Sequence, residues 1–178
     1  LLGTLDRPDQ GEIFLNEVNL GNMSGKELAR FRNENIGFVF QFHNLLPEFS
    51  ALENICIPGW MNKSKSAAEV EKRANELMKM LGISQRSNHK PSQLSGGEQQ
   101  RTAVARALIN NPEIVLADEP SGNLDTHNAE DLHDLFFTLR EKYDQTFVIV
   151  THNEKLANKA DRKWEMADGK ILNYQSTE

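Results

Sequence analysis

The stretch LSGGEQQRTAVARALINNPEIVLADEPSGNLD, residues 94–125, joins a glycine-rich turn, a helical segment, an apolar strand and a pair of acids without a gap. Ser95 and Glu98 form the S-x-x-E capping-box pattern of a helix start, and Gly96 and Gly97 let the backbone approach a ligand closely. Backbone amides at such a start attract anions, phosphate included. Taken alone, however, this turn is more often an ordinary helix cap than a phosphate site.

A short buried strand follows the helix and ends in acidic residues. The run Ile114–Ala117 is apolar, and Asp118 and Glu119 come directly after it. Two carboxylates at the carboxyl end of a buried strand are costly unless they serve a cation or a reaction. A capped turn, a helix and a strand ending in two acids seldom arise together from packing needs alone, so the combination indicates a nucleotide-hydrolysing site.

The motifs of this stretch resemble those of the ATP-binding-cassette (ABC) ATPases. LSGGEQQR resembles the family's signature motif, IVLADEP its Walker B strand and SGNLD its D-loop, and the resemblance extends over nearly the whole chain. It implies an α/β fold, a P-loop NTPase (RecA-like) core with a mostly parallel sheet, plus a helical subdomain. By this resemblance residues 1–42 and 94–178 form the core parts and residues 43–93 the helical subdomain, with the signature helix 95–110 packing at its boundary.

Composition limits the function classes. The 178 residues suffice for one domain with a real core, and the formal net charge of −6 argues against a nucleic-acid-binding surface. Cys56 is the single cysteine, which excludes an internal disulfide, and the five histidines lack the spacing of a zinc site. No apolar run is long enough to cross a bilayer, so we expect a cytoplasmic chain whose membrane role, if any, is peripheral and acts through a protein partner.

The beginning of the chain, LLGTLDRPDQGE (residues 1–12), reads as the tail of a helix that enters a turn. In ABC ATPases the helix that ends in this kind of sequence begins with the Walker A loop, G-x-x-x-x-G-K-[ST], and that motif is absent from the 178 residues. The resemblance therefore implies a fragment in which the N-terminal Walker A strand and loop are missing. We expect the full-length protein to be an ATPase, this fragment to be inactive, and the strand at 146–151 to lack a neighbour.

Two further apolar strands deliver polar residues at their ends. Ile36–Phe40 is followed by Gln41, and Thr146–Thr151 is followed by His152. Alone, a glutamine or a histidine at a strand end is usually structural. Because the carboxyl ends of parallel strands lie together, His152 is expected near Asp118, and by resemblance it is the H-loop histidine and Gln41 the Q-loop glutamine.

The remaining pattern predicts several helices and a hairpin. Residues 26–35 and 128–143 read as helices, and a helix that starts at Ala51 is expected to break at Pro58. An amphipathic helix over 67–81 carries Glu69 and Arg73 at the spacing of an ion pair, with Gly82 as its cap. Residues 161–174 have the pattern of a hairpin around an Asp-Gly turn.

The resemblance also implies roles for the residues at the strand ends. Asp118 would hold Mg²⁺ through a water, Glu119 would polarise the attacking water, His152 would contact the γ-phosphate, and Gln41 would complete the metal and water shell. The implied cofactors are ATP and Mg²⁺. Phosphoryl transfer to water needs these parts together with a phosphate cradle, which the 178 residues do not supply.

The signature turn implies a second subunit. By resemblance Ser95, Gly96 and Gly97, with Glu98 completing the turn, bind the γ-phosphate of a nucleotide seated on the other member of a homodimer, and Asp125 reaches across that interface. Transmembrane permease subunits are the other implied partners, at the cytoplasmic face of the bacterial inner membrane, and no nucleic acid is implied. The exposed apolar residues of 42–49 are either their docking surface or a local mini-core, and both alternatives remain open.

Within the family the resemblance is strongest to the ATPases of the lipoprotein-releasing system. It is carried by QFHNLLPEFSALEN (residues 41–54) and by HKPSQ (residues 89–93) ahead of the signature. Macrolide and peptide exporters share LADEP, SGNLD-like and LSGG motifs and form the alternative. A soluble ABC ATPase of DNA repair or translation would contain a long coiled coil or tandem cassettes, and neither is present in the sequence. A non-catalytic module would not need Glu119 and His152. Glu98 stands where many relatives have glutamine, and either residue completes the capping box.

Overall fold

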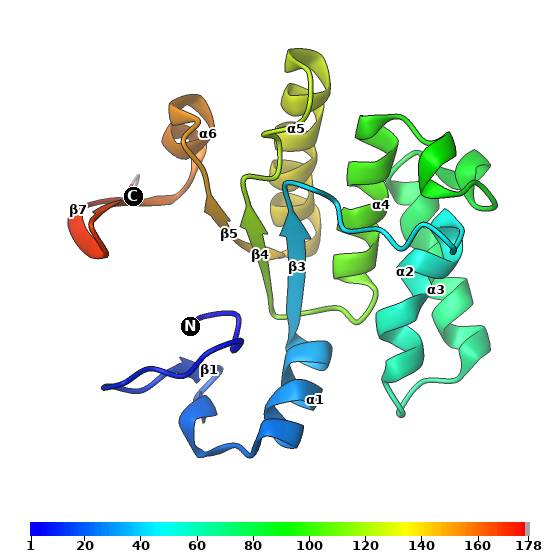
Figure 1. Ribbon diagram of the computed structural model, residues 1–178. Helices are drawn as coiled ribbons and strands as arrows, with labels where there is room; N and C mark the ends of the chain where they lie inside the picture. Colours follow the sequence, from blue (N-terminus) through cyan, green and yellow to red (C-terminus); the bar gives the residue numbers. More distant parts are fainter. Residues whose placement is uncertain (177–178) are drawn as a thin grey trace.

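A parallel three-stranded sheet lies at the centre of the computed structural model, which describes residues 1–176 (Figure 1). Its order is β3 (Ile36–Phe40), β4 (Ile114–Asp118) and β5 (Thr146–Val150). Phe40 lies opposite Asp118, and Asp118 lies opposite Val150. All three strands therefore end at the same edge of the sheet, and the residues that follow them are brought together there.

Helices cover the sheet and extend the core away from it. In Figure 1, α5 (Thr126–Tyr143) runs behind the strands and α4 (Gly96–Leu108) stands beside β3, with α2 (Ala51–Met61) and α3 (Ala67–Met80) grouped beyond α4. The close approach of α4 to β3 depends on a glycine, because a Cβ at Gly37 would lie 2.7 Å from the carbonyl oxygen of Ala107. The predicted α/β fold with a parallel core sheet is confirmed.

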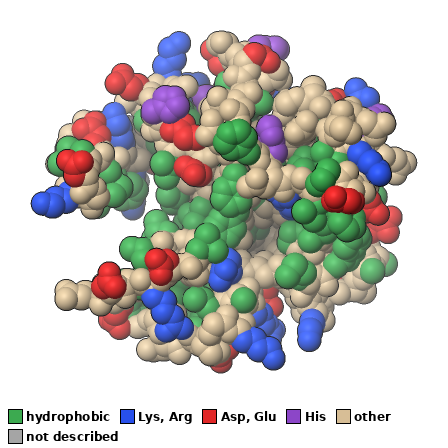
Figure 2. All heavy atoms as spheres, in the orientation of Figure 1, with side chains coloured by type: hydrophobic (Ala, Val, Ile, Leu, Met, Phe, Trp, Pro, Cys, Tyr) green, Lys and Arg blue, Asp and Glu red, His purple; other side chains and the backbone are tan. Residues whose placement is uncertain are grey.

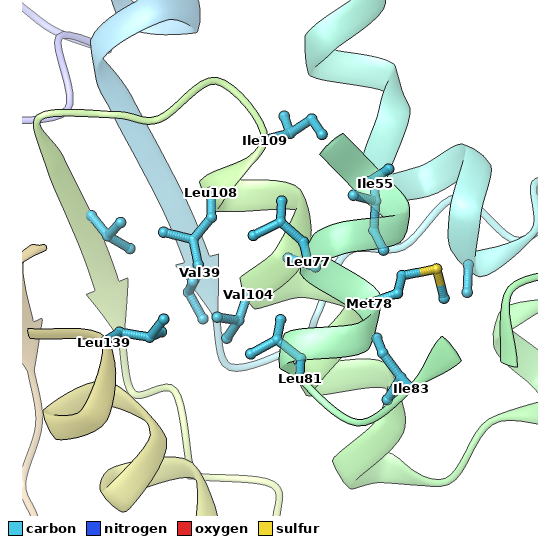
Figure 3. Packing of buried hydrophobic residues seen from close by; sticks show 14 of the residues in the cluster. Val39, Ile55, Leu77, Met78, Leu81, Ile83, Val104, Leu108, Ile109 and Leu139 are labelled. Carbon is cyan, nitrogen blue, oxygen red and sulfur yellow. The ribbon is translucent and has the colours of Figure 1, made fainter. Parts of the chain in front are cut away.

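One hydrophobic cluster joins the sheet to the helices (Figure 3). Val39 of β3, Val104 of α4, Ile55 of α2 and Leu77 of α3 are each completely buried and belong to this cluster. Fully burying an aliphatic side chain of this size contributes about 1.5–3 kcal/mol. The signature helix α4 is therefore fixed between the sheet and the helical layer by packing on both sides.

The remaining elements lie outside the three-stranded sheet. The other helices and strands are α1 (Gly25–Asn35), α6 (Glu154–Lys159), η1 (Leu20–Asn22), η2 (Ser84–Arg86), η3 (Pro91–Gln93), β1 (Phe14–Leu15), β2 (Val18–Asn19), β6 (Arg162–Ala167) and β7 (Lys170–Ser176). β1 pairs with β2, and β6 with β7, each antiparallel. The predicted hairpin is confirmed, and Asp168 and Gly169 at its turn have φ of 48° and 74°.

The expected break at Pro58 is wrong, since α2 runs through it to Met61. The carbonyl oxygen of Pro58 accepts hydrogen bonds from Asn33 Nδ2 at 3.0 Å and Asn110 Nδ2 at 3.1 Å. At the next position a Cβ on Gly59 would lie 2.6 Å from Val70 Cγ1, so α2 and α3 are in close contact there. Tertiary packing on both sides therefore stabilises the helix against the hydrogen bond that a proline removes.

The expected Glu69–Arg73 ion pair is also wrong. Glu69 instead completes a capping box at the start of α3, where its Oε2 accepts from the Ser66 amide at 2.8 Å and from Ser66 Oγ at 2.7 Å. Arg73 donates to Asn111 Oδ1 at 2.8 Å and lies 3.8 Å from Glu76. The Glu69 carboxylate therefore bonds Ser66 at the helix start and does not form the pair with Arg73 that the i,i+4 spacing predicts.

The strand β5 has β4 on one side and no partner strand on the other among residues 1–176, as the sequence predicted. Val150 at its end is 60% exposed. Of the helices described, none has the length and apolar character that crossing a membrane requires.

Candidate functional site

The carboxyl edge of the sheet gathers the polar residues predicted from the strand ends. Gln41 follows β3, Glu119 follows β4, and Thr151 and His152 follow β5. The parallel register places these three strand ends side by side. In open α/β sheets, ligands bind outside this edge.

Glu119 and His152 are in direct contact. The Glu119 carboxylate oxygen Oε1 accepts hydrogen bonds from the backbone amide and from Nδ1 of His152, both at 2.8 Å. A carboxylate can only accept, so Nδ1 of His152 carries a proton, and Nε2 makes no hydrogen bond within residues 1–176. Glu119 is largely covered, whereas the His152 side chain is 85% exposed. The pair therefore presents an oriented carboxylate next to an imidazole that is open to a ligand.

The backbone at Glu119 is unusual and is held by its neighbours. Its φ is 42°, in the left-handed region that few non-glycine residues adopt. Its amide donates to the Val150 carbonyl oxygen at 2.9 Å and its own carbonyl oxygen accepts from Gly122 at 3.0 Å. Strain of this kind persists where the surrounding structure fixes it, and it is common at functional sites.

Asp118 and Gln41 offer the oxygen ligands that Mg²⁺ prefers. Asp118 is exposed at the end of β4, and none of residues 1–176 donates a hydrogen bond to its carboxylate. Within those residues no group of three or more His, Cys, Asp or Glu is placed to hold a metal. Mg²⁺ is usually held by one or two protein ligands together with water and substrate phosphates. The Asp118 carboxylate and the Gln41 amide oxygen fit that kind of site, where the ion would neutralise phosphate charge.

The loop between β4 and α5, residues 119–125, is bonded to the end of β3 and to α5. Gln41 Nε2 donates to Asn123 Oδ1 at 3.2 Å, and Asn123 Nδ2 donates to the backbone carbonyl oxygen of Gln41 at 3.1 Å. On the other side Ser121 Oγ lies 3.0 Å from Nε2 of His133, a buried residue of α5. Burial, followed by the charge of Lys159, lowers the pKa of His133. Asn123 and His133 were not predicted from the sequence.

The glycine turn at the start of α4 has the predicted capping box. Ser95 Oγ accepts from the Glu98 amide at 3.3 Å, and Glu98 Oε2 accepts from the Ser95 amide at 2.8 Å. The second carboxylate oxygen of Glu98 accepts from Arg86 Nε at 2.7 Å. The hydrogen bonds from the Ser95 amide and from Arg86 lower the pKa of Glu98. Arg86 was not singled out from the sequence.

Asp125 caps α5 and is used within its own loop. Its carboxylate accepts from the Asn128 amide at 3.0 Å and from Asn128 Nδ2 at 2.5 Å, and these two bonds lower its pKa. A Cβ at Gly97 would lie 2.5 Å from Asn128 Oδ1, so the glycine turn sits against the start of α5. No hydrogen bond or ion pair within residues 1–176 joins this turn directly to Gln41, Asp118, Glu119 or His152.

The segment 42–49 leaves the sheet edge with apolar side chains exposed. Arg106 donates to the carbonyl oxygens of His43 and Asn44, both at 2.6 Å, and the fully buried Asn54 bonds the backbone of Leu46. The most exposed large side chains here are Phe42, Leu46 and Phe49, at 71%, 43% and 38%. Figure 2 shows hydrophobic side chains gathered over the helical side of the molecule. Arg106 and Asn54 thus fix the backbone of this segment. Its three exposed apolar side chains do not form a closed mini-core.

Comparison with known proteins gives consistent matches. The family described as ABC transporter matches residues 1–122. The "Lipoprotein-releasing system ATP-binding protein LolD" of Cytophaga hutchinsonii is 60% identical over 172 residues, which are 97% of this chain and 78% of that protein, and its namesake in Bacteroides thetaiotaomicron is 57% identical over 96% and 78%.

Solved structures agree with the sequence relatives. The bacterial ABC transporter cassette MJ0796, a dimeric structure, superposes with a TM-score of 0.87 at 40% identity, covering 99% of this chain and 77% of that one. A second structure of the same cassette, a dimeric post-hydrolysis state bound to ADP and Pi, matches with the same TM-score, identity and coverage.

Proposed function

This chain belongs to the ABC transporter family, and from that premise we propose that it is the ATP-hydrolysing subunit that powers lipoprotein release from the bacterial inner membrane. The full-length protein is an ABC ATPase. The observation that carries the proposal is the pairing of Glu119 with His152 at the carboxyl edge of the sheet, at 2.8 Å, in a chain 60% identical to a protein of the lipoprotein-releasing system. The exporter alternative is not favoured by these relatives.

The proposed chemistry is general-base hydrolysis of the terminal phosphate. Glu119 accepts a proton from the attacking water, and the two bonds from His152 orient its carboxylate for this task. The exposed Nε2 of His152, when it also carries a proton, donates to an oxygen of the γ-phosphate. Asp118 and Gln41 supply oxygens for Mg²⁺, which neutralises phosphate charge when bound. Each role is the one that the family resemblance implies, and the position of the residue at the sheet edge supports it.

A second copy of the protein completes the site in this proposal. Ser95, Gly96 and Gly97 present the N-terminus of α4, which packs against Leu124 and Asn128 and makes no direct bond to Glu119. An anion bound there belongs to a nucleotide on the partner copy, with Glu98 supporting the turn and Asp125 near the interface. Both MJ0796 structures are dimeric, which supports the dimer that this proposal requires.

The helical layer is proposed to receive the permease. Residues 43–93, carrying α2 and α3, form the helical subdomain, and residues 1–42 and 94–178 the core parts. The exposed side chains of Phe42, Leu46 and Phe49 dock a transmembrane subunit, which places the protein peripherally at the cytoplasmic face of the membrane. Gln41 lies directly before this segment, so docking and the hydrolysis site are adjacent in the chain.

Genetic replacement tests the proposal. In Cytophaga hutchinsonii cells in which expression of the relative is repressed, the full-length protein should restore lipoprotein transfer out of the inner membrane. Membrane fractionation measures this transfer. Glu119→Gln is the control and should fail to restore it. If the wild-type protein hydrolyses ATP and is stably produced, yet lipoproteins stay in the inner membrane, the assignment to lipoprotein release is wrong while the ATPase assignment stands.

A further inference from the structure

We infer that Asn123 is a positioning residue for Gln41, and that it fixes which end of the Gln41 amide faces the metal and water position. The inference rests on the proposed function, because it takes Gln41 as an oxygen ligand in the magnesium shell. It adds a residue that acts on the site without touching substrate.

One of the two hydrogen bonds between these residues determines the orientation of the Gln41 side-chain amide. Gln41 Nε2 donates to Asn123 Oδ1 at 3.2 Å, whereas Asn123 Nδ2 donates to the backbone carbonyl oxygen of Gln41 at 3.1 Å. The nitrogen end of the Gln41 amide is therefore engaged, and its oxygen receives no hydrogen bond from residues 1–176. Mg²⁺ takes oxygen ligands, so only this orientation leaves Gln41 competent to bind it.

Gly122 provides a second, independent sign that the loop is shaped around Gln41. A Cβ at position 122 would lie 2.8 Å from Gln41 Nε2, 3.1 Å from its Cδ and 3.3 Å from its Cγ. The glutamine side chain thus lies against the backbone of the loop, where any larger residue would displace it. Gly122 and Asn123 together form a seat for the side chain of Gln41, which precedes Asn123 by 82 residues in the sequence.

The seat is fixed relative to the proposed catalytic base. Glu119 opens the same loop, and its amide and carbonyl oxygen bond Val150 and Gly122 at 2.9 and 3.0 Å. Ser121 is held by His133 at 3.0 Å. Asn123 therefore ties the glutamine at the end of β3 to the loop that carries the carboxylate at the end of β4. Outer partners of this kind orient metal ligands, and their loss typically costs 10–100-fold in metal affinity or activity.

Binding of Mn²⁺ measured by electron paramagnetic resonance, in full-length protein with a non-hydrolysable ATP analogue, tests the inference without turnover. Asn123→Ala should weaken Mn²⁺ binding about 10-fold or more, and should have no further effect in a Gln41→Ala background. Asn123→Asp keeps the acceptor for Gln41 Nε2 and should restore binding. It is compared in both backgrounds because its charge attracts the cation by itself. Asn19→Ala, which removes a remote surface amide bonded to Glu12, should leave binding unchanged.

The side-chain amide signal of Gln41 in nuclear magnetic resonance gives a readout in the absence of metal. Its hydrogen-bonded proton should be shifted in the wild type and in Asn123→Asp, and should move to a free-amide position in Asn123→Ala. Weaker Mn²⁺ binding in Gln41→Ala but unchanged binding in Asn123→Ala would overturn the inference alone, as would equal losses in both backgrounds. Unchanged Mn²⁺ binding in Gln41→Ala would overturn the proposed role of Gln41 itself, and the inference with it.

Discussion

The two polar turns of this protein, residues 95–98 at the start of α4 and residues 119–125 between β4 and α5, are stabilised in different ways. The first is closed within four residues by the reciprocal bonds of Ser95 and Glu98. The second is held by partners that lie 33, 82 and 12 residues away, namely His152, Gln41 and His133. The shape of the first turn depends on bonds among its own residues. The shape of the second turn depends on the positions of β3, β5 and α5, which carry its partners.

This difference predicts how the two turns respond to substitution. Changes in loop 119–125 should alter metal binding and turnover, because its contacts join the proposed ligands and base. Changes in the α4 turn should alter helix stability within one copy of the protein and, in the proposed dimer, the hydrolysis site of the partner copy. The four predictions that follow are ordered by the size of the expected effect.

Glu119→Gln should have the largest effect. The amide cannot accept a proton from water, so ATP turnover of the full-length protein should fall about 10²–10⁴-fold, while nucleotide binding persists. Steady-state hydrolysis and calorimetric binding measure the two quantities separately. Turnover close to the wild type would remove Glu119 from the role of base.

Gly122→Ala should lower turnover about 10-fold, because its Cβ would meet Gln41 Nε2 at 2.8 Å and displace the glutamine. Gly25→Ala is the matched control, since nothing lies within 4 Å of its Cβ at the start of α1. The melting temperature of each variant shows whether folding is retained. Equal turnover in the two alanine variants would contradict the seat formed by loop 119–125.

Gly97→Ala should destabilise the protein by about 0.5–2 kcal/mol, because the added Cβ would disturb Asn128, the partner of the α5 cap residue Asp125. Loss of a helix cap usually costs this much. The added Cβ would lie 2.5 Å from Asn128 Oδ1, and Asn128 also bonds the capping residue Asp125. Gly96→Ala is the control, because its Cβ would meet Leu124 at an ordinary 3.6 Å. Urea unfolding of the two variants should separate them, and a Gly97→Ala variant as stable as Gly96→Ala would mean that α4 and α5 adjust freely.

Glu98→Gln should have the smallest effect, since a partly exposed pair such as Arg86–Glu98 is worth at most about 1 kcal/mol. The pKa of Glu98 is lowered in the folded protein, so its stabilisation is present above the unfolded pKa and is lost as pH falls through the folded value. The difference in urea midpoint between wild type and variant should therefore be present at neutral pH and vanish in acid.

Glu27→Gln is the matched control for that experiment. Glu27 closes the same capping box with Ser24 at the start of α1, where its Oε2 accepts from the Ser24 amide at 2.8 Å, but no arginine within residues 1–176 pairs with it. Glu98→Gln should lose more stability than Glu27→Gln at neutral pH. Equal losses would mean that Arg86 contributes nothing beyond the cap.

The elements of the fold were largely predictable because their causes are local. The apolar run Ile36–Phe40 and the S-x-x-E turn at Ser95 each carry their own signal within a few residues. The break expected at Pro58 is wrong because the packing of Gly59 against α3, and the bonds of Asn33 and Asn110 to the Pro58 carbonyl oxygen, outweigh the local preference of proline. Glu69 was misjudged because its cap with Ser66 competes with the pair expected from spacing.

At the sheet edge, the strand ends were predictable and their connections were not. Parallel strands deliver Gln41, Glu119 and His152 to one edge, which the alternation of apolar runs and polar ends indicates. Nothing near Asn123 in sequence shows that its partner is Gln41, because that contact exists only once β3 and β4 are paired. The same holds for His133 and Ser121, which meet across the loop and α5.

The central claim is that the carboxylate of one copy and the α4 turn of another form each hydrolysis site, and mixed dimers of the full-length protein test it most directly. Dimers that pair Glu119→Gln on one copy with Ser95→Arg on the other should keep one intact site and hydrolyse ATP. Dimers of the double variant with wild type should have no intact site and be inactive. The reverse result, with activity only when both substitutions are on one copy, would show that both parts act within a single chain and would contradict the claim.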